Sequence, residues 1–234
     1  MSYDESYPQL ISLAVHEFRT PLSVVGGYLR LVLRDPSSGV PERQRKMLEE
    51  AEKSCARLVA LVAELSDVGK LDDGRNAFKR GPVDLFRLIT SLAEGVHEAE
   101  DRGVRLEVRG ESDGASIEGD AERLQHAFDA IFRAILREKP GPCTVVAACE
   151  RRRVDGISSA VVIVADEGGV QTAYEAPPEP FDDKRGGLGL ILPIATRVIH
   201  AHGGRMWSPR LSHSDDGLGR PRQGAAIVVI PLGS

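Results

Sequence analysis

The feature that most constrains how this chain can fold is a pair of long segments with helical apolar periodicity. From Pro8 to Arg34 the apolar residues form one helical stripe, made of Leu10, Ala14, Phe18, Leu22, Val25, Leu29 and Val32. A second run, from Glu42 to about Val68, carries Met47, Ala51, Cys55, Leu58, Leu61, Val62, Leu65 and Val68. The stretch DPSSGVP at 35–41 separates the two and is rich in turn-forming residues. We therefore predict an antiparallel helical hairpin.

The length of the two stripes also bears on assembly. One partner helix can cover only half of each stripe, so we expect the hairpin to dimerise into a four-helix bundle. We assign residues 1–72 to the hairpin, 73–81 to a polar, glycine-containing linker, and 82–234 to a second domain.

Beyond the linker, helical and strand patterns are mixed. Helical patterns are predicted over 83–101, 120–138 and 188–201, and strand patterns over 104–108, 144–149, 159–165, 206–207 and 225–230. Because there is no strict βαβ alternation, we predict a two-layer α/β sandwich on one mixed sheet. The predicted fold class is thus a helical hairpin followed by an α/β domain.

The composition excludes several classes of protein. Hydrophobic residues make up 41% and charged residues 28% of the chain, which is typical of a globular protein rather than a disordered one. No stretch approaches the roughly 20 apolar residues of a membrane-spanning helix. A net charge of −5 supplies no basic field, so neither nucleic acid nor an anionic membrane is expected as a partner.

The cysteine pattern and the N-terminal sequence bear on the cellular compartment in which the chain is expected. Cys55, Cys143 and Cys149 are scattered without CxxC spacing, which argues against a disulfide framework and a zinc site. The sequence MSYDESYPQL lacks the basic and apolar regions of a secretory signal. We therefore expect a cytoplasmic chain with reduced thiols. Since the first predicted helix starts at Pro8, we expect no sensor segment ahead of the hairpin.

His16 lies on the polar face of the first predicted helix. With His16 at zero on a helical wheel, the apolar stripe falls at about 120–240°, so the imidazole points away from the core. Thr20, at about 40°, shares its face, and Glu17 lies beside it at about 100°. Pro21 interrupts the helix at a cost of roughly 3 kcal/mol, although the stripe continues on both sides. This combination distinguishes His16 from an ordinary solvated surface histidine.

The segment from His16 to Leu22, HEFRTPL, resembles the H-box HExRTPL of sensor histidine kinases. The hairpin around it resembles their dimerisation and histidine phosphotransfer domain. The resemblance implies that His16 takes the γ-phosphoryl group of ATP and passes it to an aspartate of a response-regulator receiver domain. It implies that Glu17 draws the proton from the other ring nitrogen, and that Thr20 helps to place water during dephosphorylation. A neutral imidazole beside a carboxylate has the chemistry that this role needs.

The second half resembles the ATPase-type (HATPase/GHKL) catalytic domain that follows in the same family. Its clearest signature is the glycine segment Gly187, Leu188, Gly189 and Leu190. With PI at 193–194 and HAHGGRMW at 200–207, this segment resembles the GxGLGL glycine box and the helix and strand behind it. Glycines at such a place let backbone amides at a helix N-terminus approach phosphates.

Other parts of that domain are also represented. Asp166 and Gly168 follow an apolar strand and resemble the DxGxG box, whose aspartate receives the adenine amino group. Phe181 resembles the phenylalanine of the lid. We interpret His200 and His202 as ordinary polar residues before a Gly-Gly stop. The resemblance therefore extends over nearly the whole chain.

The departures from the family pattern affect the nucleotide site. Ala130 and Ala134 stand where the family has asparagines, and the second asparagine holds Mg²⁺, for which a methyl group offers no oxygen. Val170 replaces the second glycine of DxGxG, where it would crowd the nucleotide. The short span from Asp166 to Gly187 leaves little room for a lid. These losses predict a damaged ATP site.

Two charged residues near Ala134 could take over the role of the missing asparagine. On a wheel with Ala134 at zero, Glu138 falls at about 40° and Arg137 at about −60°. The two could supply a displaced Mg²⁺ ligand or a metal-free phosphate clamp. The simpler interpretation is a charged helix terminus. We assign no metal ligands and no cofactor, with ATP and Mg²⁺ retained only for the rescued site.

Three functions remain open from the sequence. The leading hypothesis is a homodimeric phosphorelay protein in which His16 exchanges phosphoryl groups with receiver domains, an upstream hybrid kinase being one candidate donor. The alternative is an ATP-dependent sensor histidine kinase with a divergent metal site. The third is a non-catalytic regulator that inhibits a true kinase through its bundle. Ala130, Ala134 and Val170 separate the first two, and His16 separates both from the third.

Overall fold

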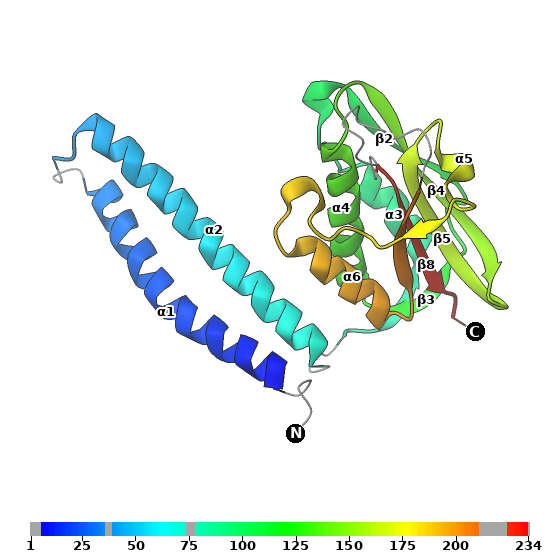
Figure 1. The fold of residues 1–234 in the computed structure, drawn as a ribbon, viewed down its shortest axis with the longest axis horizontal. Helices are drawn as coiled ribbons and strands as arrows, with labels where there is room; N and C mark the ends of the chain where they lie inside the picture. Colours follow the sequence, from blue (N-terminus) through cyan, green and yellow to red (C-terminus); the bar gives the residue numbers. More distant parts are fainter. Residues whose placement is uncertain (1–5, 36–38, 74–77, 211–223, 234) are drawn as a thin grey trace. The chain divides into compact units, whose positions relative to one another are not determined.

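The computed structural model describes residues 6–35, 39–73, 78–210 and 224–233, whose course is shown in Figure 1. The chain divides into two compact units, residues 1–76 and 77–234. Among the described residues, the first unit is helical and the second contains the strands.

The first unit is a hairpin of two long helices, α1 (Ser6–Arg34) and α2 (Glu42–Asp72) (Figure 1). Helix α2 begins after Pro41, whose carbonyl accepts the Arg45 N–H at 2.9 Å. It ends where the Asp73 N–H bonds the Gly69 carbonyl at 3.1 Å. The predicted helical hairpin is confirmed.

Small residues bring the two helices close together in the middle of the hairpin. A Cβ atom added to Gly26 would lie 3.3 Å from the Cys55 sulfur. The Cys55 thiol itself donates to the Leu22 carbonyl at 3.4 Å. Towards the open end, Ile11 and Val15 of α1 are also buried. The seam between α1 and α2 is therefore narrow.

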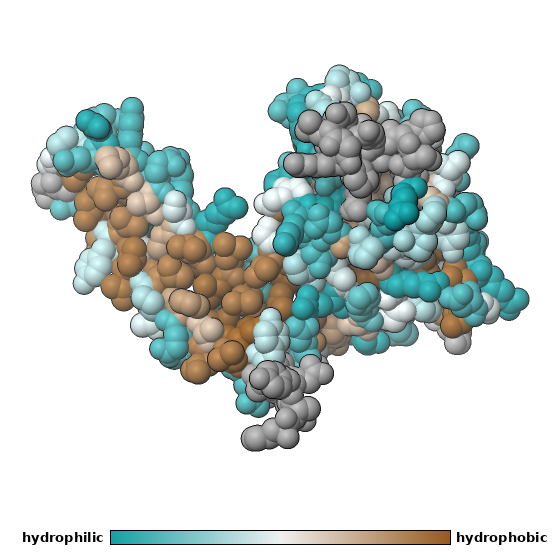
Figure 2. Space-filling view, viewed as in Figure 1, coloured by the Kyte–Doolittle hydropathy of each residue, from teal (hydrophilic) through white to brown (hydrophobic). Residues whose placement is uncertain are grey.

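Much of the predicted apolar stripe is outside this seam. Leu10, Phe18, Val25 and Val32 are exposed. Figure 2 shows the apolar surface extending along the hairpin. The exposed large apolar residues of α1 and α2 are Tyr7, Leu10, Leu13, Phe18, Val24, Val25, Tyr28, Leu31, Val32, Met47, Leu58 and Val59. A continuous apolar surface of this kind is typical of an interaction site.

The second unit is built on a six-stranded mixed sheet of order β2-β4-β5-β8-β7-β6, with a separate pair β1-β3. Strands β2 and β4 are parallel, and the other neighbours are antiparallel. The strands are β1 (Gly81–Asp84), β2 (Val104–Gly110), β3 (Ser116–Gly119), β4 (Cys143–Val154), β5 (Ile157–Asp166), β6 (Pro178–Glu179), β7 (Arg205–Pro209) and β8 (Ala226–Pro231).

Three helices cover one face of this sheet: α3 (Leu85–Ala93), α4 (Ala121–Arg137) and α6 (Ile191–Ala201) (Figure 1). The short helix α5 (Val170–Ala173) lies on the opposite side. Two 3₁₀ turns, η1 (Glu100–Arg102) and η2 (Arg185–Gly187), complete the described elements. The predicted two-layer α/β fold class is confirmed.

Both faces of the central strands are buried, which explains their nearly continuous apolar sequence. In β5, successive side chains from Ala160 to Ala165 alternate between the two faces, and all are buried. Val161 and Ile163 belong to a cluster with Val170 and Ala173 of α5. That cluster covers the face away from the three long helices.

Two predicted helices were placed wrongly at their ends. The helix predicted over 83–101 is only α3, because Asp84 belongs to β1 and caps α3 by accepting the Arg87 N–H at 3.3 Å. Further on, Ala99 has φ of 64°, which a continuous helix does not permit. The helix predicted from Leu188 starts at Ile191, since Gly187 and Gly189 have positive φ.

His202 is a structural residue, and its interpretation as an ordinary polar residue was wrong. It is 8% exposed at the end of α6, whereas His200 is exposed. Its Nδ1 donates to the Val198 carbonyl at 2.7 Å, and its Nε2 accepts the Asp120 N–H at 2.9 Å. The bond to Asp120 ties the end of α6 to the N-cap of α4.

This burial makes the second unit sensitive to acid. Burial, helped by the nearby Arg80 and Arg123, lowers the pKa of His202 from the usual 6.5, against the opposing effects of Val198 and Asp120. The unfolded chain therefore takes up the proton first as pH falls below 6.5, so the folded state loses stability in that window. His202→Gln should remove this part of the pH dependence.

The measurement is urea unfolding at about pH 7.5 and about pH 5.5, followed by the fluorescence of Trp207. Trp207 is the single tryptophan and lies on β7, so it reports on the second unit. If the wild type and His202→Gln lost the same stability between the two pH values, the acid sensitivity would not come from His202.

Candidate functional site

His16 is accessible on α1. Its side chain is 78% exposed, and that of Glu17 is 71% exposed. The Nδ1 atom of His16 lies 3.4 Å from Oε1 of Glu17, a long hydrogen bond. When Nδ1 carries the proton, Nε2 holds the lone pair and is the nucleophilic nitrogen. The geometry therefore gives an exposed nucleophile with a carboxylate beside its other nitrogen.

The helix is altered directly after His16. Pro21 lies inside α1 and has no N–H to offer the carbonyl of Glu17, one turn earlier. Ser23 donates its hydroxyl to the Arg19 carbonyl at 2.8 Å. Thr20 is exposed. The three catalytic residues predicted from the sequence thus share one exposed segment of α1.

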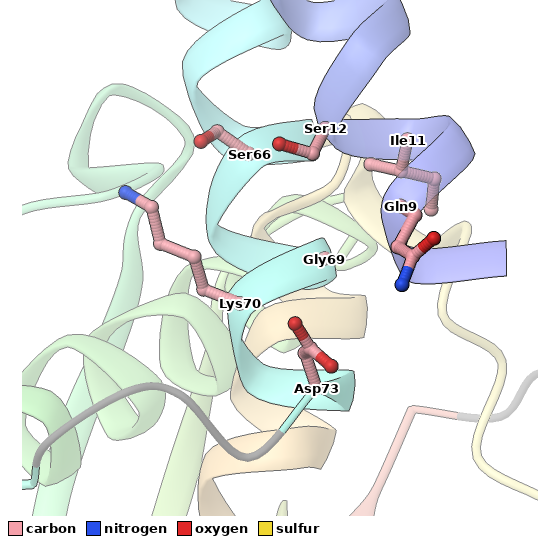
Figure 3. A pocket seen from close by; sticks show the side chains of 7 residues that line it. All are labelled: Gln9, Ile11, Ser12, Ser66, Gly69, Lys70 and Asp73. Carbon is pink, nitrogen blue, oxygen red and sulfur yellow. The ribbon is translucent and has the colours of Figure 1, made fainter. Parts of the chain in front are cut away.

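A small polar hollow lies at the open end of the hairpin (Figure 3). The hydroxyl of Ser12 on α1 points towards α2, whereas the hydroxyl of Ser66 on α2 points away from Ser12, and Lys70 directs its ammonium group away from the hollow. Ser12 precedes His16 by one helical turn. The lining residues are Gln9, Ile11, Ser12, Ser66, Gly69, Lys70 and Asp73.

In the second unit, Asp166 ends β5 and is 55% exposed. Its Oδ1 lies 2.6 Å from Nζ of Lys139, which is only 6% exposed. The same ammonium group donates to the Gly224 carbonyl at 2.9 Å. Gly168 follows in a turn and has open space where a Cβ would lie. The carboxylate predicted to receive adenine is therefore already paired with a cation of this chain.

The glycine segment lies in the loop before α6. Gly187 and Gly189 have φ of 62° and 67°, and Leu190 is the N-cap of the helix. These positive φ angles explain why glycine stands at both positions. The backbone amides of this loop lead into a helix N-terminus, which favours anions in general.

The residue before this segment packs on α4. A Cβ on Gly186 would lie 2.9 Å from Cα of Ala134 and 3.3 Å from its carbonyl oxygen. Ala134 is completely buried, and Ala130 is nearly so. The backbone of η2 therefore lies against Ala134, the helix position at which the sequence resemblance implies a metal-binding asparagine.

Glu138 is not placed as a displaced metal ligand. Nε of Arg185 donates to its Oε1 at 2.9 Å, and Nη2 of Arg185 bonds Oε2. Arg137 donates to the Gly186 carbonyl at 3.3 Å and pairs with Glu98. No group of three or more metal-ligating side chains occurs within the described ranges. The residues around Ala134 do not fit a Mg²⁺ site.

Val170, which the sequence analysis expected to crowd the nucleotide, is part of the core of the second unit. The residue is buried at the start of α5, in the cluster with Val161 and Ile163 on the face away from the long helices. Arg185 and Lys139 were missed by sequence reasoning. The one signal for Arg185 was the short span between Phe181 and Gly187, which must keep the intervening residues near α4.

The comparisons with known proteins agree with this geometry. Residues 9–74 match the His Kinase A (phospho-acceptor) domain. The chain is 33% identical over 209 residues to the probable sensor histidine kinase TcrY of Mycobacterium tuberculosis, covering 84% of this chain and 42% of TcrY. It is 30% identical over 236 residues to the sensor protein CutS of Streptomyces coelicolor, covering 94% and 51%.

Solved structures show the same fold. Full-length ShkA, crystallised in complex with AMPPNP, aligns with a TM-score of 0.67 at 22% identity, covering 97% of this chain and 46% of ShkA. The chain therefore carries a HisKA domain, and it is similar to sensor histidine kinases over most of its length. It spans about half the length, or less, of the curated relatives that it matches. Of the helices described, none has the length and apolar content needed to cross a bilayer.

The placement of Val170 leads to a stability prediction. Val170→Gly should destabilise the second unit by about 2 kcal/mol, because it removes a buried side chain and leaves a cavity. Gly168→Ala is the matched control, since its new Cβ meets nothing within 4 Å. Urea unfolding followed by Trp207 fluorescence measures both. Unchanged stability of Val170→Gly would show that the side chain is not part of the core.

Proposed function

We propose that this chain is a two-component phosphorelay protein in which His16 exchanges a phosphoryl group with receiver aspartates. The observation that carries the proposal is the exposed pair of His16 and Glu17 within the segment that matches the phospho-acceptor domain. A HisKA domain in general implies a response-regulator partner. An upstream hybrid kinase is one candidate donor.

The transfer step follows from the geometry at His16. The lone pair of Nε2 attacks the phosphorus of a receiver's aspartyl phosphate, so that the Nε2–P bond forms and the P–O bond to the aspartate breaks. As positive charge develops on the imidazole, the Glu17 carboxylate beside Nδ1 is proposed to draw the Nδ1 proton, which leaves a neutral phosphoimidazole and a protonated Glu17. The reverse step returns the group to a receiver aspartate. Thr20, on the same face, is proposed to place water when the phosphoryl group is hydrolysed instead.

Binding of ATP is proposed to be impaired. Ala134 offers no oxygen for Mg²⁺, and the Gly186 backbone lies directly on it. Asp166, Gly168 and the segment 187–190 are then a vestigial nucleotide site, and the second unit chiefly docks partners. The alternative of an active kinase with a divergent metal site has less support, because Glu138 is already bound by Arg185.

The chain is proposed to act as a homodimer. The exposed apolar side chains of α1 and α2 are too extensive for a stable isolated surface. Leu58, on α2, is one of them. A second hairpin with the same surface would complete a four-helix bundle.

Dimerisation through the hairpin can be tested by introducing a single charge into the apolar surface. Leu58→Glu should give a monomer, because it places a carboxylate in an apolar interface. Arg57→Gln is the control, since it shifts the net charge by the same amount at the neighbouring exposed residue. Light scattering at micromolar concentration measures the mass. A monomeric wild type, or a dimeric Leu58→Glu, would contradict the bundle.

Phosphotransfer can be tested with a radiolabelled receiver. A phosphorylated receiver domain should label the wild-type chain, and the label should be acid-labile and base-stable, as a phosphoramidate is. His16→Ala should abolish labelling without unfolding, because the side chain is exposed. His200→Ala, which changes another exposed histidine, should be labelled normally.

The same protein should take little or no label from γ-labelled ATP with Mg²⁺. Labelling of His16→Ala by the receiver would remove the assignment of His16. Strong labelling of the wild type from ATP would instead make the chain an active kinase.

A further inference from the structure

We propose that two internal ion pairs, Arg185–Glu138 and Lys139–Asp166, form a latch that holds the nucleotide region of the second unit closed. The proposal rests on the proposed function in one respect, namely that nucleotide binding is impaired. It adds a cause that the missing asparagines do not supply: cations of the chain itself occupy the carboxylates of the site.

Arg185 is held on every side. Its side chain is 2% exposed, although its charge would favour water. Besides Glu138, its Nη1 donates to the Ser208 hydroxyl at 3.3 Å and to the Ala225 carbonyl at 3.0 Å. The ring of Phe181 lies 5.2 Å from its guanidinium carbon. The guanidinium is thus a fixed part of the interior, joined to α4, β7 and the segment before β8.

Lys139 forms the second half of the latch. Its ammonium group bonds Asp166 and the Gly224 carbonyl, next to the Ala225 carbonyl that accepts from Arg185. The two cations therefore bind the carbonyls of two consecutive residues, and each pairs with one carboxylate. Lys139 occupies Oδ1 of Asp166 and neutralises its charge, so the carboxylate is a weaker acceptor for an adenine amino group than an unpaired one.

The latch also holds the glycine loop. Arg185 directly precedes Gly186, so the burial of the guanidinium keeps the Gly186 backbone on Ala134. Arg137 adds a bond to the Gly186 carbonyl from the outside. A polyphosphate entering between the loop and α4 must first displace this contact.

The test removes both members of the buried Arg185–Glu138 pair, together with Lys139 of the second pair. Breaking one partner of a buried pair leaves an unpaired charge and destabilises the protein, whereas neutral replacements of both are tolerated. The opened variant therefore carries Arg185→Met, Glu138→Gln and Lys139→Met. Asp166 is kept, because it is partly exposed and can be hydrated. A milder variant, Lys139→Met alone, leaves the Arg185 pair in place.

The control removes another pair of the same unit. Arg205 lies 2.8 Å from Asp155, and both side chains are exposed. Arg205→Met with Asp155→Asn removes these charges without touching the latch. Asparagine suits the positive φ of residue 155. Urea unfolding, followed by Trp207 fluorescence, confirms that each variant is folded.

The measurement is the affinity for a fluorescent methylanthraniloyl derivative of ADP, with and without Mg²⁺. We expect weak or undetectable binding to the wild type and the control, and binding tightened by about tenfold or more in the opened variant. Lys139→Met should give part of this gain. Equal affinity of a folded opened variant and the wild type would overturn the latch, as would tight binding by the wild type.

The failure of the latch can be told apart from failure of the proposed function. Transfer from a phosphorylated receiver to His16 is measured on the same wild type and does not involve Arg185 or Lys139. Loss of that transfer counts against phosphorelay alone. The affinity for the ADP derivative decides the latch whatever the transfer result.

Discussion

The contact between the Gly186 backbone and Ala134 is the constraint on which the site region of the second unit depends. The short connection from Phe181 to Gly187 brings its backbone onto α4, and this requires a helix position without a long side chain. The methyl group of Ala134 meets that requirement. The same methyl group offers no oxygen to a metal ion. In the proposed function, the missing metal ligand and the close approach of the loop are therefore two consequences of one residue.

In the hairpin, helix α1 carries both an exposed apolar surface and the exposed His16. In α1 the exposed Phe18, Val25 and Val32 lie on the side of the helix opposite His16, so association through these three would leave the imidazole accessible. The close approach of Gly26 and Cys55 keeps the two helices of the hairpin in a narrow seam. A single helix can therefore carry the phospho-accepting histidine on one side and an association surface on the other.

Features formed by residues that are close in the sequence could be predicted, whereas features formed by residues far apart in the sequence could not. Helices α1 and α4 follow from local periodicity, and the Asp120 cap of α4 is visible in the sequence. Strands β3 and β6 are too short to show a period. His202 could not be recognised as buried, because its partner Asp120 lies 82 residues away in the chain.

The sequence by itself determined the two long helices, the exposure of His16 beside Glu17, and the absence of an oxygen ligand at Ala134. Within one helix, neighbours along the chain are neighbours in space, so periodicity and motif are enough. Only the tertiary structure decided that Arg185 pairs with Glu138 and that Val170 belongs to the core. Both contacts join segments that are far apart in the sequence and are brought together by the sheet, so no local sequence pattern predicts them.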